Sequence, residues 1–118
     1  MQVLVIEPDR WARKAFTRML QRSGARVNES ASIRAAAEQF ASYIFDAIVC
    51  QATAADAQDC HKVLDQLRVN WSSGVVLVSG GFIQSDQQDV SATGSVALLP
   101  KPCTYQELMM AVGSVAVK

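Results

Sequence analysis

The stretch Val3-Leu4-Val5-Ile6-Glu7-Pro8-Asp9 decides the fold class of this chain. Its first four residues form a continuous apolar run rich in β-branched side chains, which is typical of a strand buried on both faces of a sheet. Pro8 ends the run, and Asp9 is a plausible N-cap for a following helix. The stretch therefore predicts a buried parallel strand that leads directly into a helix.

The same pattern recurs along the chain. Further apolar strands are predicted at 47–50, 75–78 and 96–99, with a short strand that begins at Arg26 and ends near Asn28. Helical spacing of apolar residues predicts helices before Gly24, from 33 to about 42 after the cap Ser32, around 60–67, and after the cap Thr104. Residues 82–93 are polar and predict a weak helix at best, and 71–74 predict a turn.

Five strands that alternate with helices require a parallel sheet covered on both faces. We expect an α/β fold of the flavodoxin-like (βα)5 class, a doubly wound sheet of strand order 2-1-3-4-5 in three α/β/α layers. Residues 1–118 are expected to form one domain, because the chain length suits a single core. In such sheets, ligands and chemistry lie at the carboxyl ends of the strands.

Composition excludes several classes of function. The formal net charge is +0, which predicts neither a nucleic-acid nor a membrane partner, so we expect no direct contact with DNA. The apolar runs are too short to span a bilayer and the first residues do not resemble a signal peptide, so a cytoplasmic location is expected. Three cysteines at irregular spacing and a single histidine predict buried thiols and no metal cluster.

The residues that follow the predicted strands carry a family resemblance. Acidic Glu7 follows the first strand, Gln51 the third, Ser79 the fourth, and Lys101-Pro102 the fifth. In this order and spacing the chain resembles a response-regulator receiver domain over essentially its whole length. In that family the first strand ends in an acidic pair that holds magnesium, and the third in the aspartate that accepts a phosphoryl group. The fourth strand of such domains ends in Ser or Thr, and the fifth in Lys-Pro.

Two of these positions depart from the family pattern. Gln51 occupies the acceptor position, and a neutral amide cannot form an acyl phosphate. Pro8 occupies a position of the acidic pair and has no ligand side chain, so one carboxylate remains where the family supplies three. We expect a degenerate phosphorylation pocket of Glu7, Pro8, Gln51, Ser79 and Lys101, with no catalytic residue, no metal and no cofactor.

The remaining charges predict a specific contact. Glu7 and Lys101 can neutralise each other without a cation, so we expect their side chains to lie within about 6 Å, with Gln51 bonded to one of them. The resemblance also implies a cis peptide bond between Lys101 and Pro102. Leu98 takes the place of the family's switch aromatic, and an aliphatic side chain cannot swing a ring inward to report phosphorylation.

A basic stripe is predicted on the first helix by the fourfold spacing of Arg10, Lys14, Arg18 and Arg22, with Arg26 beyond its end. The stripe is either a solvated helix face or a docking surface for an acidic partner, a phosphate or a cyclic dinucleotide. Trp11, expected to be half exposed beside it, could stack on a base.

Three functions remain open after these observations. The leading hypothesis is a pseudo-receiver, which is not an enzyme and acts by contact with a protein partner: a kinase, an output domain or a second copy in a homodimer. An alternative is a phospho-accepting receiver with a displaced acceptor, for which Asp9 and Asp56 are the candidates. A further alternative is a sensor of a nucleotide or a cyclic dinucleotide.

Overall fold

The fold was analysed in a computed structural model, which describes residues 1–52, 57–80 and 95–116. Five strands form one parallel sheet in the order β2-β1-β3-β4-β5. The strands are β1 (Gln2–Ile6), β2 (Arg26–Ser30), β3 (Ala47–Gln51), β4 (Gly74–Ser79) and β5 (Val96–Pro100). The described helices are α1 (Arg10–Arg22), α2 (Ile33–Phe40), α3 (Ala57–Arg68) and α5 (Tyr105–Val115). The predicted fold class and strand order are confirmed.

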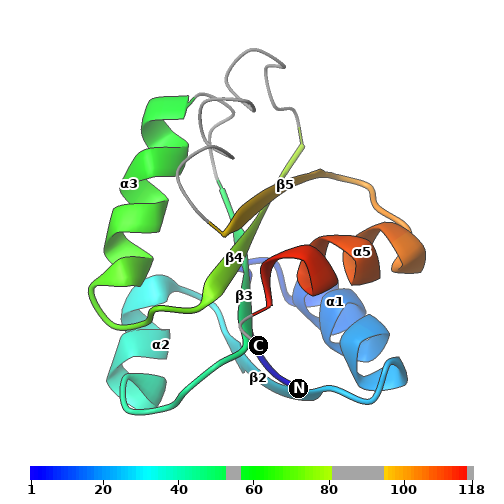
Figure 1. The fold of residues 1–118 in the computed structure, drawn as a ribbon, viewed down its shortest axis with the longest axis horizontal. Coiled ribbons are helices and arrows are strands. Elements are labelled where there is room, and N and C mark those ends of the chain that lie inside the picture. Colours follow the sequence, from blue (N-terminus) through cyan, green and yellow to red (C-terminus); the bar gives the residue numbers. More distant parts are fainter. Residues whose placement is uncertain (53–56, 81–94, 117–118) are drawn as a thin grey trace.

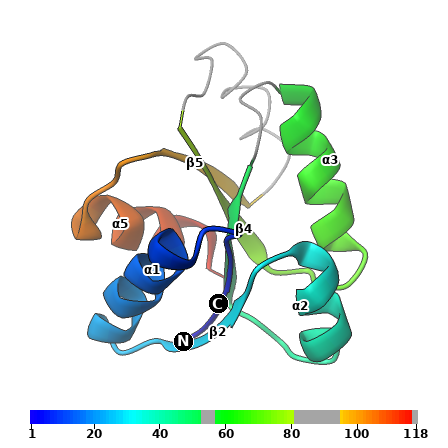
Figure 2. The same cartoon turned by 180° about the vertical axis from the view of Figure 1, so that it is seen from behind.

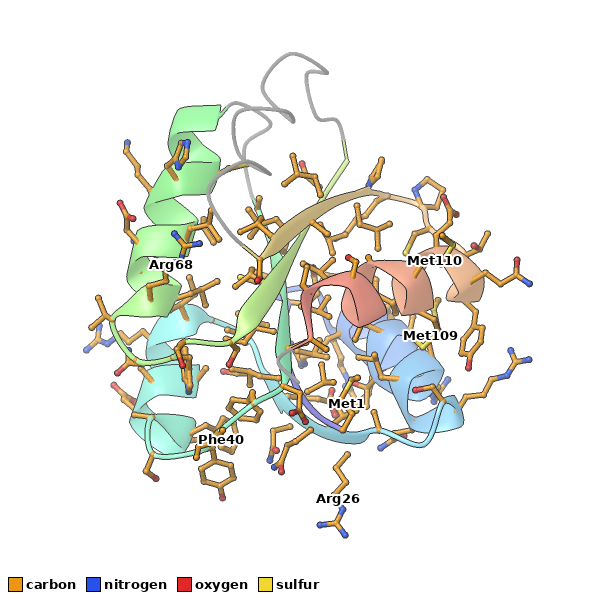
Figure 3. All side chains as sticks on the ribbon, viewed as in Figure 1. Met1, Arg26, Phe40, Arg68, Met109 and Met110 are labelled. Carbon is orange, nitrogen blue, oxygen red and sulfur yellow. The ribbon has the colours of Figure 1, made fainter. Side chains whose placement is uncertain are left out.

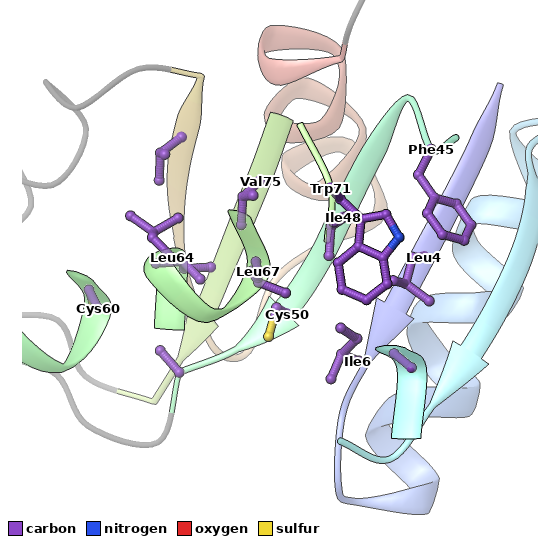
Figure 4. Close-up of a cluster of buried hydrophobic side chains, with 14 residues drawn as sticks. Leu4, Ile6, Phe45, Ile48, Cys50, Cys60, Leu64, Leu67, Trp71 and Val75 are labelled. Atoms are coloured by element: carbon purple, nitrogen blue, oxygen red, sulfur yellow. The ribbon is translucent and has the colours of Figure 1, made fainter. Parts of the chain in front are cut away.

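Two of the described helices cover each face of the sheet. Figures 1 and 2 show α1 and α5 on one side and α2 and α3 on the other. Alternate residues of β1 divide between the two cores: Val3 and Val5 pack with α1 and α5, whereas Leu4 and Ile6 pack with α2 and α3. Figure 4 shows Leu4 and Ile6 among the side chains of the α2/α3 core. This division explains why the strand reads as an uninterrupted apolar run.

The helix caps follow the sequence signals. The Asp9 carboxylate accepts a hydrogen bond from the Ala12 amide at 2.9 Å, and the Ser32 hydroxyl accepts one from the Ala35 amide at 3.0 Å. Thr104 and Glu107 form a reciprocal capping box at the start of α5. Gly24, which follows α1, has a φ of 93°. Residues that carry a Cβ rarely adopt this backbone conformation.

Several predicted boundaries were wrong. Strand β2 continues to Ser30, because its last residues pair with Val5 and Ile6 of β1 although they are polar. Helix α2 ends at Phe40 instead of near residue 42. The predicted turn at 71–74 is also partly wrong, since Gly74 is the first residue of β4 and Trp71 is buried. The weak helix predicted at 82–93 lies outside the described residues.

Among the described residues, no helix has the length and apolar character needed to cross a membrane.

Candidate functional site

The predicted site residues meet at the carboxyl edge of the sheet. Ile6 pairs with Cys50, so Glu7, directly after β1, and Gln51, the last residue of β3, lie at the same level of the sheet. Ser79 is the last residue of β4, and its carbonyl oxygen accepts a hydrogen bond from the Lys101 amide at 2.8 Å. Because parallel strands all point the same way, their C-terminal residues gather at one edge. The fold therefore brings Glu7, Gln51, Ser79 and Lys101 together, as the sequence predicted.

A buried ion pair lies at the centre of this edge. The Lys101 Nζ donates to Glu7 Oε2 at 3.1 Å. The Glu7 side chain is 2% exposed and the Lys101 side chain is 27% exposed, so the carboxylate is the more deeply buried partner. The predicted contact between the two side chains is confirmed. The Lys101-Pro102 peptide bond is cis, as the family resemblance implied.

Further groups hold Glu7 in place. Its second carboxylate oxygen, Oε1, accepts a hydrogen bond from the Asp9 amide at 3.2 Å. Its backbone carbonyl accepts one from Arg13 Nη1 at 2.8 Å. Among the described residues, no hydrogen bond joins the Gln51 amide group to Glu7 or to Lys101, so that expectation was wrong. Gln51 itself is half-buried at the end of β3.

The side chains that the structure describes at this edge do not fit a magnesium ion. Glu7 directly follows β1, and the Lys101 ammonium already lies 3.1 Å from one of its carboxylate oxygens. Pro8 is exposed and offers no side-chain oxygen, and the carboxylate of Asp9 caps α1. A divalent cation prefers several oxygen ligands, mostly carboxylates, and would have to displace the Lys101 ammonium to bind here. The Glu7–Lys101 pair takes the place that a cation would need.

The Cys50 thiol lies beside this charged edge. Burial, and to a smaller extent the negative charge of Glu7, raises the pKa of Cys50 from 9.0 to about 12. The thiol therefore stays protonated at neutral pH and is a poor nucleophile. Sequence reasoning treated Cys50 only as a small hydrophobic residue, since nothing in the sequence indicates which charge it faces.

The raised pKa of Cys50 predicts that the stability of the fold depends on pH. The folded state keeps the Cys50 proton between pH 9.0 and about 12, whereas the unfolded state loses it above pH 9.0, so stability should fall as pH rises through this window. The contribution has a limiting slope of about 1.4 kcal/mol per pH unit. Urea unfolding of the natural chain and of Cys50→Ala at neutral pH and at about pH 10 measures it. We expect a shallower pH dependence in Cys50→Ala, and equal pH dependences would contradict the assignment.

The basic stripe on α1 is only partly available. Lys14 Nζ donates to Glu29 Oε2 at 3.0 Å, and the Arg22 guanidinium lies 4.5 Å from the centre of the Tyr105 ring. Arg10 and Arg18 are exposed, and Trp11 is 80% exposed, which is more than the half exposure that we expected. Sequence reasoning missed Glu29 and Tyr105 as partners, because both lie on other elements of the fold.

Two other predicted positions stand as follows. Leu98 of β5 is partly buried against the α2/α3 core and pairs with Leu77 of β4. Asp9 caps α1 with its carboxylate, and Asp56 lies outside the described residues. The cap accounts for the Asp9 side chain without any role as an acceptor.

Comparisons with known proteins show what fold this chain has. No protein-family model and no curated protein matches the sequence. The structure is similar to the chemotaxis protein CheY4 of Vibrio cholerae, with 18% identity, a TM-score of 0.73 and 97% of each chain covered. It is also similar to a CheY-like response regulator receiver domain of Methylobacillus flagellatus, with 22% identity, a TM-score of 0.76 and 97% of each chain covered.

A third similar structure comes from a different kind of protein. It is assigned to pilus assembly (CpaE2) in Sinorhizobium meliloti, with 15% identity, a TM-score of 0.76, and 97% of this chain and 98% of that chain covered. Because the sequence identities to these structures are between 15% and 22%, the similarity establishes the fold alone. The chain therefore has the fold of CheY-like receiver domains over nearly its whole length.

Proposed function

We propose that this chain is a receiver-type signalling module that works without aspartyl phosphorylation and has no catalytic activity of its own. The observation that carries the proposal is the buried Glu7–Lys101 ion pair, at 3.1 Å, beside Gln51 at the acceptor position. The site is electrically balanced without a phosphoryl group and without a metal ion.

Two chemical requirements of aspartyl phosphorylation are unmet by the described residues at this edge. The nucleophile would have to be a carboxylate, and Gln51 carries an amide. The reaction needs cations to neutralise charge at phosphorus, and the one lysine at the strand ends is already paired with Glu7. Removing Glu7 from Lys101 would also leave a buried carboxylate without a counter-charge, which is strongly unfavourable.

The proposed module acts through its surface, by contact with a protein partner such as a kinase or an output domain. The exposed part of the α1 stripe, Arg10 and Arg18 beside Trp11, is the candidate docking surface. Trp and Arg are the residue types that dominate binding energy at protein interfaces. The positive charges of Arg10 and Arg18 suit an acidic partner surface. The similar structures include a chemotaxis protein and a protein assigned to pilus assembly, so the fold alone leaves the output open.

A phosphodonor experiment tests this proposal. Incubation with a small acyl phosphate and Mg²⁺, followed by intact-mass measurement, should give no species heavier by one phosphoryl group. A receiver domain that keeps its acceptor aspartate serves as the positive control in the same buffer. A phosphorylated species would refute the proposal, and loss of that species in Asp9→Asn or Asp56→Asn would identify a displaced acceptor.

A further inference from the structure

An open hollow of about 480 Å³, which we call the α1 hollow, lies between α1 and the connection from β5 to α5. It is lined by Ala12, Ala15, Phe16, Met19, Lys101, Pro102 and Cys103. The lining residues of α1 recur every three or four positions, so they lie along one face of the helix. Figures 1 and 2 show α1 and α5 next to each other on the same side of the sheet.

The burial of the α1 residues shows how the hollow is built. Phe16 is 6% exposed, whereas Ala12 and Met19 are half-buried and Ala15 is exposed. Phe16 therefore lies at the floor of the hollow. Ala12 and Ala15 end at Cβ and leave space above this floor. The volume lies within the range of small-ligand pockets, about 300–1,000 Å³.

The lining of the hollow suits an aromatic ring. Met19 and Cys103 carry sulfur atoms, and thioether sulfur in particular makes favourable contacts with aromatic rings. Phe16 offers a ring at the floor, and offset or edge-to-face pairs of rings are stabilising. Trp11, which is 80% exposed, lies one turn before Ala15 on α1, so a further aromatic side chain borders the open edge of the hollow. A flat, rigid ring also loses less entropy on binding than a flexible chain does.

Positive charge lies at the same open edge. Arg18 is exposed and follows Ala15 by three residues, so the two side chains are neighbours on the helix surface. Within the part of the chain that the structure describes, Arg18 takes part in no ion pair. Its guanidinium can therefore bind a carboxylate through two parallel hydrogen bonds. Lys101 also lines the hollow, but its ammonium is paired with Glu7.

We propose that the α1 hollow binds a small aromatic carboxylate. The ring of the ligand lies over Phe16, between Met19 and Cys103, and its carboxylate pairs with Arg18 at the open edge. The lining favours the ring and the arginine favours the negative charge, so an uncharged analogue binds more weakly. This inference goes beyond the proposed function, because it assigns a small ligand and its test uses neither a phosphodonor nor a protein partner.

Two matched probes, indoleacetate and the uncharged indoleacetamide, test the ring and the charge separately. Titration of the isotope-labelled chain at pH 7, followed by NMR, should move the backbone amide signals of Ala12, Ala15, Met19 and Cys103. Indoleacetate should bind with a Kd below about 1 mM. Indoleacetamide should bind about fivefold more weakly, because it lacks the charge-assisted bonds to Arg18. Arg18→Gln should weaken the binding of indoleacetate about fivefold and leave that of indoleacetamide unchanged.

A tryptophan placed in the hollow gives an independent test. Ala15→Trp should weaken the binding of both probes at least about tenfold, because its indole takes up the space above Phe16. Met110→Trp is the matched control, because Met110 is 77% exposed on α5 and does not line the hollow (Figure 3). Circular dichroism should show that both variants stay folded, since both substituted positions are exposed.

Several results would overturn the proposal. One is a Kd for indoleacetate above about 1 mM in the natural chain. Others are equal affinities for the two probes, or an Arg18→Gln variant that binds indoleacetate as tightly as the natural chain does. If Ala15→Trp and Met110→Trp changed the affinities equally, or if the shifted amide signals came from residues away from α1 and the β5–α5 connection, the α1 hollow would not be the binding site.

Discussion

Lys101→Met is expected to lower the free energy of unfolding by about 2–3 kcal/mol, because it leaves the Glu7 carboxylate buried without its counter-charge. The Glu7 side chain is 2% exposed, and its other described side-chain bond is a 3.2 Å contact with the Asp9 amide. The expected loss is at the lower end of the range for buried pairs, because Lys101 is 27% exposed and water can reach part of the site. Urea denaturation at pH 7 measures the effect.

Two variants control this prediction. Adding Glu7→Gln to Lys101→Met should recover most of the lost stability, because a neutral amide replaces the unpaired charge. Lys14→Met removes an ion pair of almost the same length, 3.0 Å to Glu29, but on the surface, and should cost less than about 1 kcal/mol. If Lys101→Met and Lys14→Met had the same effect, the pair at the strand ends could not be the balanced, buried contact that we describe.

Gly74→Ala is expected to destabilise the domain by about 3 kcal/mol, because there is no space for even one methyl group at this position. A Cβ at Gly74 would overlap the backbone carbonyl of Val115, at the end of α5. Backbone cannot rotate away as a flexible side chain can, so either the start of β4 or the end of α5 must move. Val112 and Val115, both buried, would lose part of their packing against the sheet. Thermal and urea unfolding provide the measurement.

Gly113→Ala is the matched control for this substitution. Gly113 lies in α5, the helix that approaches Gly74, and it is exposed. A Cβ at Gly113 would meet no atom within 4 Å. Alanine has a higher helix propensity than glycine, so this variant should gain about 0.5–1 kcal/mol. If Gly74→Ala were as stable as the natural chain, the close approach of α5 to β4 would be wrong.

Much of the fold could be predicted from the sequence, as particular residues show. The run from Val3 to Ile6 predicted a buried strand, and the alternation of strands with helices predicted the sheet order, because periodicity reflects burial directly. The caps Asp9, Ser32 and Thr104 were found because their hydrogen bonds are local. Strand β2 was predicted too short, since the polar Glu29 and Ser30 belong to an edge strand whose pairing with β1 leaves no apolar signature.

Some contacts of the candidate site could also be predicted from the sequence, and others could not. Glu7 and Lys101 are 94 positions apart, yet their contact could be predicted, because the resemblance placed both at strand ends and their opposite charges balance. The partners of the basic stripe could not be predicted, since Lys14 meets Glu29 across α1 and β2, and Arg22 meets Tyr105 across α1 and α5. The spacing of residues along the chain does not indicate which surfaces of different helices and strands come into contact.

The sequence by itself determined the order of strands, the helix caps, the neutral amide of Gln51 at the end of β3 and the charges of Glu7 and Lys101 at the strand ends. Each of these depends on local periodicity or on the chemistry of one residue. The tertiary structure decided which side of the α1 stripe remains exposed and that Ile44 and Val69, in the connections that precede β3 and β4, are exposed. These features depend on how the connections at the ends of the sheet pack together, and such packing arises from contacts between residues far apart in the chain.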